Sequence, residues 1–197
     1  MAKIKICGLR TQADIQIVNR YQPDYAGFII NFPKSFRSLS IDKVKELTQN
    51  LDKSIQSVGV FVDEDVDVVC SCLKEGIIDI AQLHGNEDEN YILKIKEFGP
   101  TIKAFQIKTK EDIEEALLSK ADYVLFDQGK GSGKTFDWSL IPRIERKFFL
   151  AGGITLDNIE KTKDIHPYAI DVSSSVETER KKDEEKIKEM IQKGRRI

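Results

Sequence analysis

Two side chains that can carry protons each end a short apolar run typical of a β-strand. Cys7 closes the run Lys3–Cys7, and Asp127 closes the run Tyr123–Asp127. In folds built from parallel strands, ligands bind beyond the carboxyl ends of the strands, so two such ends can meet one substrate. A thiol and a carboxyl group placed there could remove and deliver protons around one small molecule. Taken singly, a cysteine often packs as a small apolar side chain and an aspartate often caps a turn.

The elements that must position these residues alternate along the chain. Eight apolar runs are mostly continuous, as expected for strands buried on both faces. The predicted strands are Lys3–Cys7, Tyr25–Ile30, Gln56–Val62, Ile78–His84, Ile102–Ile107, Tyr123–Asp127, Phe148–Gly152 and Ala169–Val172. Segments with helical spacing lie between them. The predicted helices are Gln12–Arg20, Ile41–Leu51, a segment after Asp63, a segment after Asn86, Glu111–Leu118, Leu156–Lys163 and Asp183–Lys193.

Eight such units, at roughly 25 residues each, predict an α/β fold, a closed (β/α)₈ barrel or TIM barrel. We expect residues 1–197 to form this barrel as a single domain, because no linker or low-complexity stretch interrupts the pattern. The structural alternative is an open doubly wound sheet. The absence of a dinucleotide-binding fingerprint favours closure over that alternative.

Bulk composition indicates an ordinary soluble globular protein. A formal charge of −2 and a pI near 5.8 give no reason to expect nucleic acid or a membrane as a partner. The chain has three cysteines and no apolar leader, so we expect reduced thiols and a cytoplasmic location. Cys70 and Cys72 lie two residues apart, and only His84 and His166 could join them, so no metal-binding spacing emerges.

The last two predicted strands end in residues suited to binding phosphate. Gly152 and Gly153 would let backbone N–H groups approach an anion, and Ser173 and Ser174 follow the next strand. In barrels of this kind phosphate commonly binds between the loops after strands seven and eight. Two ordinary turns are the alternative, but their joint placement favours phosphate.

The glycine-rich stretch Gly129–Thr135 suggests a nucleotide-binding loop, but its spacing is wrong. A P-loop requires glycine five positions before Gly133-Lys134-Thr135, and Gln128 stands there instead. A mobile loop after Asp127 that folds over a bound substrate fits better.

Two further positions near strand ends carry polar side chains that could meet a ligand. Arg37 lies in a long loop after the second strand, and its planar fork could hold a carboxylate at two points. His84 ends the fourth strand close to Gln82. A solvated arginine and a structural histidine remain the simpler interpretations of these residues.

Taken together, these residues resemble the phosphoribosylanthranilate isomerases of the tryptophan pathway, along essentially the whole chain. No single motif is decisive, but their order and spacing are specific. The motifs are Lys5-Ile6-Cys7-Gly8, Gly27-Phe28 through Ser35 and Arg37, Val58-Gly59-Val60-Phe61, Gln82-Leu83-His84-Gly85, Gly131-Ser132-Gly133 with Phe136-Asp137-Trp138, Leu150-Ala151-Gly152-Gly153 and Asp171-Val172-Ser173-Ser174.

The resemblance implies an Amadori rearrangement of N-(5-phosphoribosyl)anthranilate to 1-(o-carboxyphenylamino)-1-deoxyribulose 5-phosphate. By the family pattern Asp127 is the general acid, Cys7 is the general base and Arg37 holds the anthranilate carboxylate. The remaining substrate-binding residues that it implies are Gln82, His84, Gly152, Gly153, Asp171, Ser173 and Ser174. The implied reaction needs neither a cofactor nor a metal, its partner is a small phosphorylated molecule, and the chain could act as a monomer or a homodimer.

The chain departs from the family pattern at several positions. Ile30 replaces a common aromatic residue, Phe36 stands where proline is frequent, and Ser175 occupies a place usually held by glycine. The stretch Glu177–Lys182 lacks the usual Pro-Gly, so the shape of the phosphate loop is open.

Three alternative functions remain compatible with a barrel. The first is another sugar-phosphate isomerase or epimerase, although such enzymes generally use paired carboxylates, a lysine or a metal. The second is a dual-substrate isomerase that also acts in histidine synthesis, for which no second phosphate-binding signal is visible. The third is a barrel that binds a phosphorylated ligand without converting it, which the fold alone does not exclude.

Overall fold

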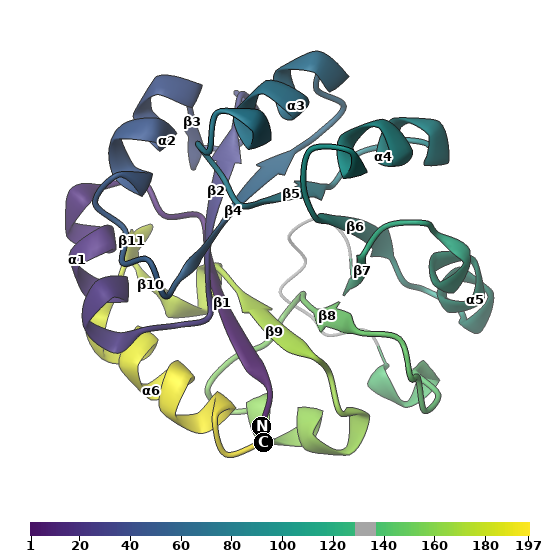
Figure 1. Ribbon diagram of the computed structural model, residues 1–197. Helices are drawn as coiled ribbons and strands as arrows, with labels where there is room; N and C mark the ends of the chain where they lie inside the picture. The colour runs from purple at the N-terminus through teal and green to yellow at the C-terminus, as the bar shows by residue number, and fades with distance from the viewer. Residues whose placement is uncertain (129–136) are drawn as a thin grey trace.

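The computed structural model describes residues 1–128 and 137–197, in which eight parallel strands close into a barrel (Figure 1). The strands follow the order β1-β9-β8-β7-β6-β5-β4-β2, and pairing between β1 and β2 closes the ring. The predicted (β/α)₈ barrel is therefore confirmed, and the open sheet is excluded. The glycine-rich loop predicted at Gly129–Gly133 lies outside the described residues.

The strands occupy the predicted runs: four have the predicted ends, and the ends of the other four shift by at most two residues. The barrel strands are β1 (Lys3–Cys7), β2 (Tyr25–Ile30), β4 (Gln56–Phe61), β5 (Ile80–Leu83), β6 (Thr101–Gln106), β7 (Tyr123–Asp127), β8 (Phe148–Leu150) and β9 (Ala169–Val172). Three short strands are additional. They are β3 (Ser38–Leu39), which extends the sheet beside β2, and the antiparallel hairpin β10 (Glu177–Thr178) and β11 (Lys181–Lys182).

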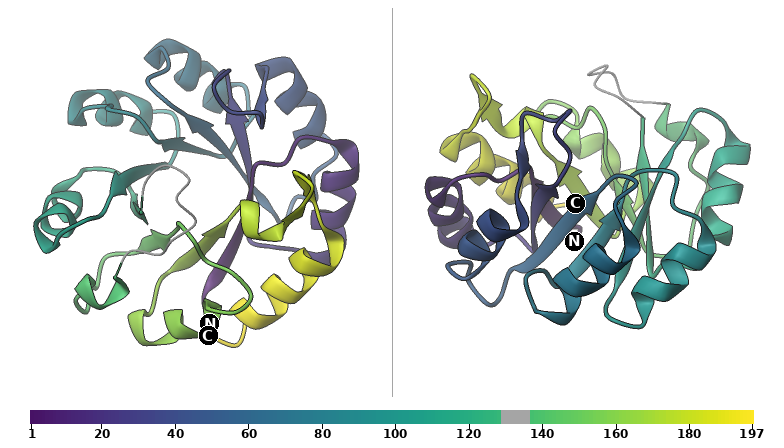
Figure 2. Two further views of the ribbon diagram at one scale, coloured as in Figure 1. Left: turned by 180° about the vertical axis from the view of Figure 1, so that it is seen from behind. Right: turned by 90° about the horizontal axis from the view of Figure 1, so that it is seen from above.

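Among residues 1–128 and 137–197, six α-helices surround the barrel, as Figures 1 and 2 show. They are α1 (Gln12–Tyr21), α2 (Ile41–Thr48), α3 (Val66–Lys74), α4 (Glu89–Lys96), α5 (Lys110–Leu118) and α6 (Glu184–Gly194). The capping box predicted from Thr11 and Asp14 is present at the start of α1. Helix α6 packs against α1 and β1, so the two ends of the chain lie close together (Figure 2). Nowhere in residues 1–128 and 137–197 is a helix long and apolar enough to cross a membrane.

The helix predicted at Leu156–Lys163 is wrong. The structure has a 3₁₀ helix at Ile159–Ile165, and two further 3₁₀ helices lie at Trp138–Leu140 and Ser174–Val176. The Thr162 hydroxyl donates to the Ile159 carbonyl at 2.7 Å, so a side chain competes for an acceptor that an α-helix would use. No side chain caps the start of this helix, and its turns stay tight.

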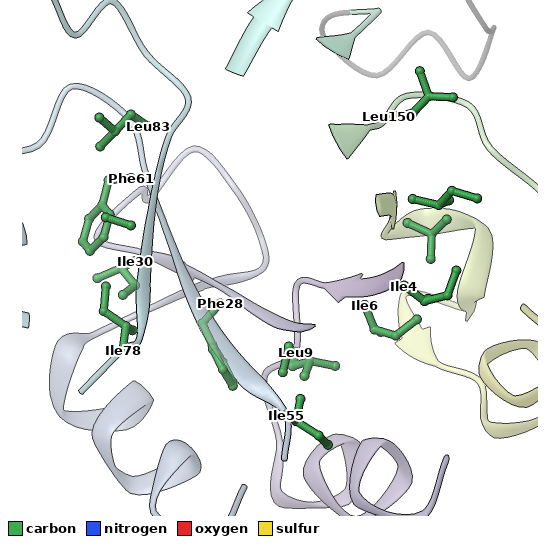
Figure 3. Packing of buried hydrophobic residues seen from close by; sticks show 14 of the residues in the cluster. Ile4, Ile6, Leu9, Phe28, Ile30, Ile55, Phe61, Ile78, Leu83 and Leu150 are labelled. Carbon is green, nitrogen blue, oxygen red and sulfur yellow. The ribbon is translucent and has the colours of Figure 1, made fainter. Parts of the chain in front are cut away.

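Alternating residues of the strands divide the core into two layers. The outward-facing residues, such as Ile4 and Ile6 of β1 and Phe28 of β2, pack beneath the helices (Figure 3). The inward-facing residues form a separate cluster inside the barrel. That cluster contains Tyr25, Val58, Ile80, Ile102, Ala104, Leu125, Phe149, Ala151 and Ala169. The buried interior also holds Lys5, Gln82 and Asp171, so it becomes polar toward the carboxyl ends of the strands.

The β10–β11 hairpin occupies the stretch Glu177–Lys182, in which the family resemblance led us to expect Pro-Gly. Its strands are joined by Glu179 and Arg180, whose φ angles are 50° and 62°. Positive φ at both turn positions is typical of type I′ hairpins, which normally use asparagine and glycine. Two residues with bulky side chains therefore form a tight turn at some cost in backbone strain.

We expect the replacement Glu179→Gly to raise the free energy of unfolding by about 0.5 kcal/mol, measured by urea denaturation. Relief of the positive-φ cost outweighs the additional freedom that glycine gives the unfolded chain. The matched control is Glu189→Gly, an exposed position inside α6, which should lower the free energy by about 1 kcal/mol. Equal destabilisation by both replacements would contradict the prediction.

Candidate active site

Cys7 lies at the carboxyl end of β1, where the neighbouring strand leaves space for its sulfur. Cys7 pairs in register with Gly27 of β2, and its side chain is only 8% exposed. A Cβ atom at position 27 would lie 2.8 Å from the Cys7 sulfur. Gly27 therefore has to be glycine for the thiol to occupy this position.

A buried ion pair lies beneath Cys7. Lys5 is two residues earlier on the same face of β1 and is fully buried, and its ammonium group donates to Asp171 Oδ2 at 2.7 Å. Burial would lower the pKa of Lys5, but the Asp171 carboxylate and the nearby Cys7 raise it overall. Asp171 Oδ1 is also buried and has no hydrogen-bond partner in the described part of the chain.

The protonation of Cys7 is set by opposing effects. Burial raises the pKa of the thiol above its ordinary value, while the positive charges of Lys5 and Lys182 act in the lowering direction and Asp171 adds to the rise. The net shift is upward. The sulfur is therefore a neutral thiol at neutral pH when nothing is bound.

Asp127 is the last residue of β7. It faces His84, which lies in the loop after β5. The His84 Nε2 atom lies 3.4 Å from Asp127 Oδ2, and the Gln82 amide lies 3.1 Å from His84 Nδ1. An amide N–H that donates to Nδ1 leaves the ring proton on Nε2, which faces Asp127. Gln82 Oε1 is buried and unpartnered within residues 1–128 and 137–197. Gln82, His84 and Asp127 thus form one chain of polar contacts.

The loop after β8 is shaped around Asp127. Gly152 has a φ of 84°, and a Cβ atom there would lie 2.5 Å from Asp127 Oδ1. Gly153 also has a positive φ, and its carbonyl accepts from the Asn158 amide at 2.9 Å. Gly152 therefore makes space for the carboxyl group, and phosphate binding by the glycine pair stays a prediction.

The loop after β9 contacts Cys7 and Arg37. The Ser173 hydroxyl donates to the Cys7 carbonyl at 3.0 Å, whereas Ser174 is exposed. The Arg37 guanidinium donates through Nε and Nη2 to both carboxylate oxygens of Glu177, at 2.8 and 2.6 Å. The structure therefore brings Cys7, Arg37, Asp171 and Ser173 together on one side of the mouth.

Four residues of this arrangement were absent from the sequence-based set: Lys5, Gly27, Glu177 and Lys182. Lys5 and Gly27 stand inside the motifs that carry the family resemblance, which was the one available signal for them. Their contacts depend on pairing between distant strands. Within the described residues no group of three or more His, Cys, Asp and Glu side chains could hold a metal ion.

The fold and this mouth define a (β/α)₈-barrel protein with a thiol, a histidine–carboxyl contact and an arginine gathered near the carboxyl ends of its strands. The family model of N-(5'-phosphoribosyl)anthranilate (PRA) isomerase matches residues 4–193. The chain therefore belongs to the phosphoribosylanthranilate isomerase family.

Individual relatives agree along the full length of the chain. It is 42% identical to the N-(5'-phosphoribosyl)anthranilate isomerase of Clostridium acetobutylicum and 45% identical to that of Clostridium kluyveri, with complete coverage of both chains in each case. The crystal structure of the Thermotoga maritima enzyme superposes with a TM-score of 0.91 at 33% identity, again with complete coverage. A further phosphoribosylanthranilate isomerase was solved in complex with reduced 1-(o-carboxyphenylamino)-1-deoxyribulose 5-phosphate. It superposes with a TM-score of 0.87 at 32% identity, with complete coverage of both chains.

We expect alkylation of Cys7 by iodoacetamide to accelerate as the pH rises above 7, with its midpoint above the value of about 8.5 for an exposed thiol. A raised pKa keeps the sulfur protonated and unreactive at neutral pH, and only the thiolate reacts. The rate is measured by mass spectrometry of the peptide that contains Cys7. In Lys5→Met the midpoint should move higher, because a positive charge that lowers the pKa is lost. A midpoint at or below that of an exposed thiol, about 8.5, would contradict the direction of the shift.

Proposed function

We propose that this chain catalyses the Amadori rearrangement of N-(5-phosphoribosyl)anthranilate to 1-(o-carboxyphenylamino)-1-deoxyribulose 5-phosphate in tryptophan biosynthesis. The observation that carries the proposal is the placement of Cys7 and Asp127 at the carboxyl ends of β1 and β7 in one closed parallel barrel. Such ends face a common ligand. Family membership supports the same reaction.

Asp127 is the proposed general acid for ring opening. Its carboxylic acid protonates the furanose ring oxygen, the bond from that oxygen to C1 breaks, and the amine lone pair forms the C1=N iminium. The contact with His84 holds the carboxyl group in one orientation. A correctly placed acid of this kind contributes about 10²–10⁴ in rate.

Cys7 is the proposed general base for the second step. Its thiolate takes the proton from C2, the electrons of that bond form C1=C2, and the iminium nitrogen becomes neutral. The resulting enolamine then tautomerises to the C2 ketone. Because burial keeps Cys7 protonated in the free protein, the thiol has to release its proton to solvent before it can take the proton from C2. The cationic iminium, Lys5 and Lys182 then stabilise the thiolate.

The anionic ends of the substrate are assigned to the surrounding loops. The Arg37 guanidinium holds the ring carboxylate, and the backbones at Gly152-Gly153 and Ser173-Ser174 hold the phosphate. These two phosphate loops follow adjacent strands, because β8 and β9 pair directly.

The ribose hydroxyls are assigned to two buried acceptors of the mouth. Asp171 Oδ1 and Gln82 Oε1 lack partners in the part of the chain that the structure describes. Buried acceptors left unpaired are costly, so both fit a ligand that brings O–H donors. The reaction as written consumes no cofactor. The chain acts as a monomer or a homodimer, and the Thermotoga maritima relative is described as dimeric, with monomers generated from it.

We expect Cys7→Ala and Asp127→Asn each to lower kcat by at least about two orders of magnitude, with modest changes in KM. Each variant removes one proton-transfer group and leaves the binding loops in place. Turnover is measured as the decay of substrate fluorescence after adding purified protein. Near-wild-type turnover in either variant would remove that residue from the mechanism.

A matched control uses a cysteine outside the mouth. Cys72→Ala on α3 also deletes a buried thiol, but its position beneath a helix should leave kcat unchanged within about twofold. A flat fluorescence trace with folded wild-type protein would instead support a barrel that only binds its ligand.

A further inference from the structure

Three charged side chains from two different loops form one ionic cluster at the mouth of the barrel. Glu177 Oε1 accepts from Arg37 Nε and from Lys182 Nζ, both at 2.8 Å, and Oε2 accepts from Arg37 Nη2 at 2.6 Å. The side chains of Arg37, Glu177 and Lys182 are only 17, 7 and 2% exposed. Charge-assisted bonds in such surroundings are strong and directional.

The cluster connects directly to the loop that carries Cys7. Lys182 Nζ donates to the Ser173 carbonyl at 3.0 Å, and the Ser173 hydroxyl donates to the Cys7 carbonyl. A Cβ atom at Gly8 would lie 2.5 Å from Arg37 Cδ, so the arginine stem packs against the residue after Cys7. Movement of the cluster would therefore displace groups next to the reacting atoms.

The contacts of Arg37 divide its guanidinium into an occupied edge and an available edge. Glu177 takes the edge formed by Nε and Nη2. The outer edge, formed by Nη1 and the second hydrogen of Nη2, has no acceptor among residues 1–128 and 137–197. A planar guanidinium can bind two carboxylates at these two edges. The Phe36 ring, 4.1 Å from Arg37 Cζ, covers one face and restrains rotation.

Charge explains why the cluster needs its third member. Arg37 and Glu177 alone would form a neutral pair with little attraction for an incoming carboxylate. Lys182 restores a net charge of +1. Burial would raise the pKa of Glu177, but hydrogen bonds from Arg37 and Lys182 lower it below its ordinary value, so it stays ionised at neutral pH.

We propose that Glu177 is a positioning residue which, with Lys182, holds the Arg37 guanidinium so that its outer edge receives the ring carboxylate of the substrate. Glu177 thereby sets selectivity for an N-aryl ribosylamine phosphate that carries an ortho carboxylate over one that lacks it. This inference rests on the proposed function, because it assigns the ring carboxylate to the same mouth.

The experiment compares two substrates in the variant Glu177→Gln. One is the phosphoribosyl adduct of anthranilate and the other is the adduct of aniline, which has no carboxylate. For the anthranilate adduct we expect KM to rise about tenfold or more with kcat within about threefold, because uniform binding is lost. For the aniline adduct kcat/KM should change by less than about threefold, so the selectivity ratio falls about tenfold.

Three further variants make the result specific. In the Arg37→Ala background Glu177→Gln should cause no further loss of selectivity, because the positioned group is gone. Lys182→Met, which keeps an apolar stem, should also lower selectivity, and it provides a second test if Glu177→Gln does not fold. Glu184→Gln breaks an ion pair with Arg20 on the outer surface and should leave both substrates unaffected.

The outcomes separate this inference from the proposed function. If wild type converts the anthranilate adduct but Glu177→Gln or Lys182→Met lowers kcat/KM equally for both substrates, the role of Glu177 is structural and the inference is overturned alone. An additive loss in the Arg37→Ala background would overturn it as well. If folded wild type converts neither adduct, the proposed function and the inference both fail.

Discussion

A lysine enclosed within the barrel is the constraint on which the arrangement of the mouth depends. Lys5 is fully buried, its ammonium group lies 2.7 Å from Asp171, and the two residues are direct partners in the β1–β9 register. Removing one member of a buried ion pair typically costs about 3–5 kcal/mol, because the remaining charge is left uncompensated. Any slip between the first and last barrel strands would separate these charges. The pair therefore fixes the register at this seam and, two residues further along β1, the position of Cys7.

Side chains alternate between the inside and the outside of the barrel along each strand, and this two-residue period determines which residues of the other strands face the site. Inward positions of β5, β7 and β9 change from apolar at one end to polar at the other, so Gln82, Asp127 and Asp171 lie above a tightly packed base. Small residues then provide the space that these groups need. Gly27 accommodates the Cys7 sulfur, and Gly152 accommodates the carboxyl group of Asp127. The geometry of the mouth is thus determined as much by missing Cβ atoms as by the reactive side chains.

Sequence alone predicted the elements whose signals are local. Continuous apolar runs identified all eight barrel strands, and the Thr11–Asp14 capping box identified the start of α1. The prediction was wrong at Leu156–Lys163, because a threonine hydroxyl that competes for a backbone carbonyl leaves no visible trace in hydrophobic spacing. Local signals also gave the list of candidate site residues, because many of them directly follow predicted strands. Residues at strand ends can be found from the ends of the apolar runs, but what each side chain contacts cannot.

The ionic cluster at the mouth shows why those contacts lie beyond sequence analysis. Arg37 and Glu177 are 140 residues apart, and a formal charge of −2 for the whole chain gives no indication that cations gather at one site. The guanidinium carbons of Arg10 and Arg180 each lie 5.2 Å from the centre of the Phe36 ring, and that of Arg37 lies 4.1 Å from it. Within the ionic cluster, Glu177 is the one acid, and it accepts from both Arg37 and Lys182. Such a local excess of positive charge favours an anionic ligand whatever the net charge of the protein, because fields at short range dominate over distant charges. The departures from the family pattern at Phe36 and at the Glu179-Arg180 turn are therefore compatible with anion binding. The Phe36 ring packs against Arg37 and holds this arginine in place. The Glu179-Arg180 turn still closes the hairpin that carries Glu177 and Lys182.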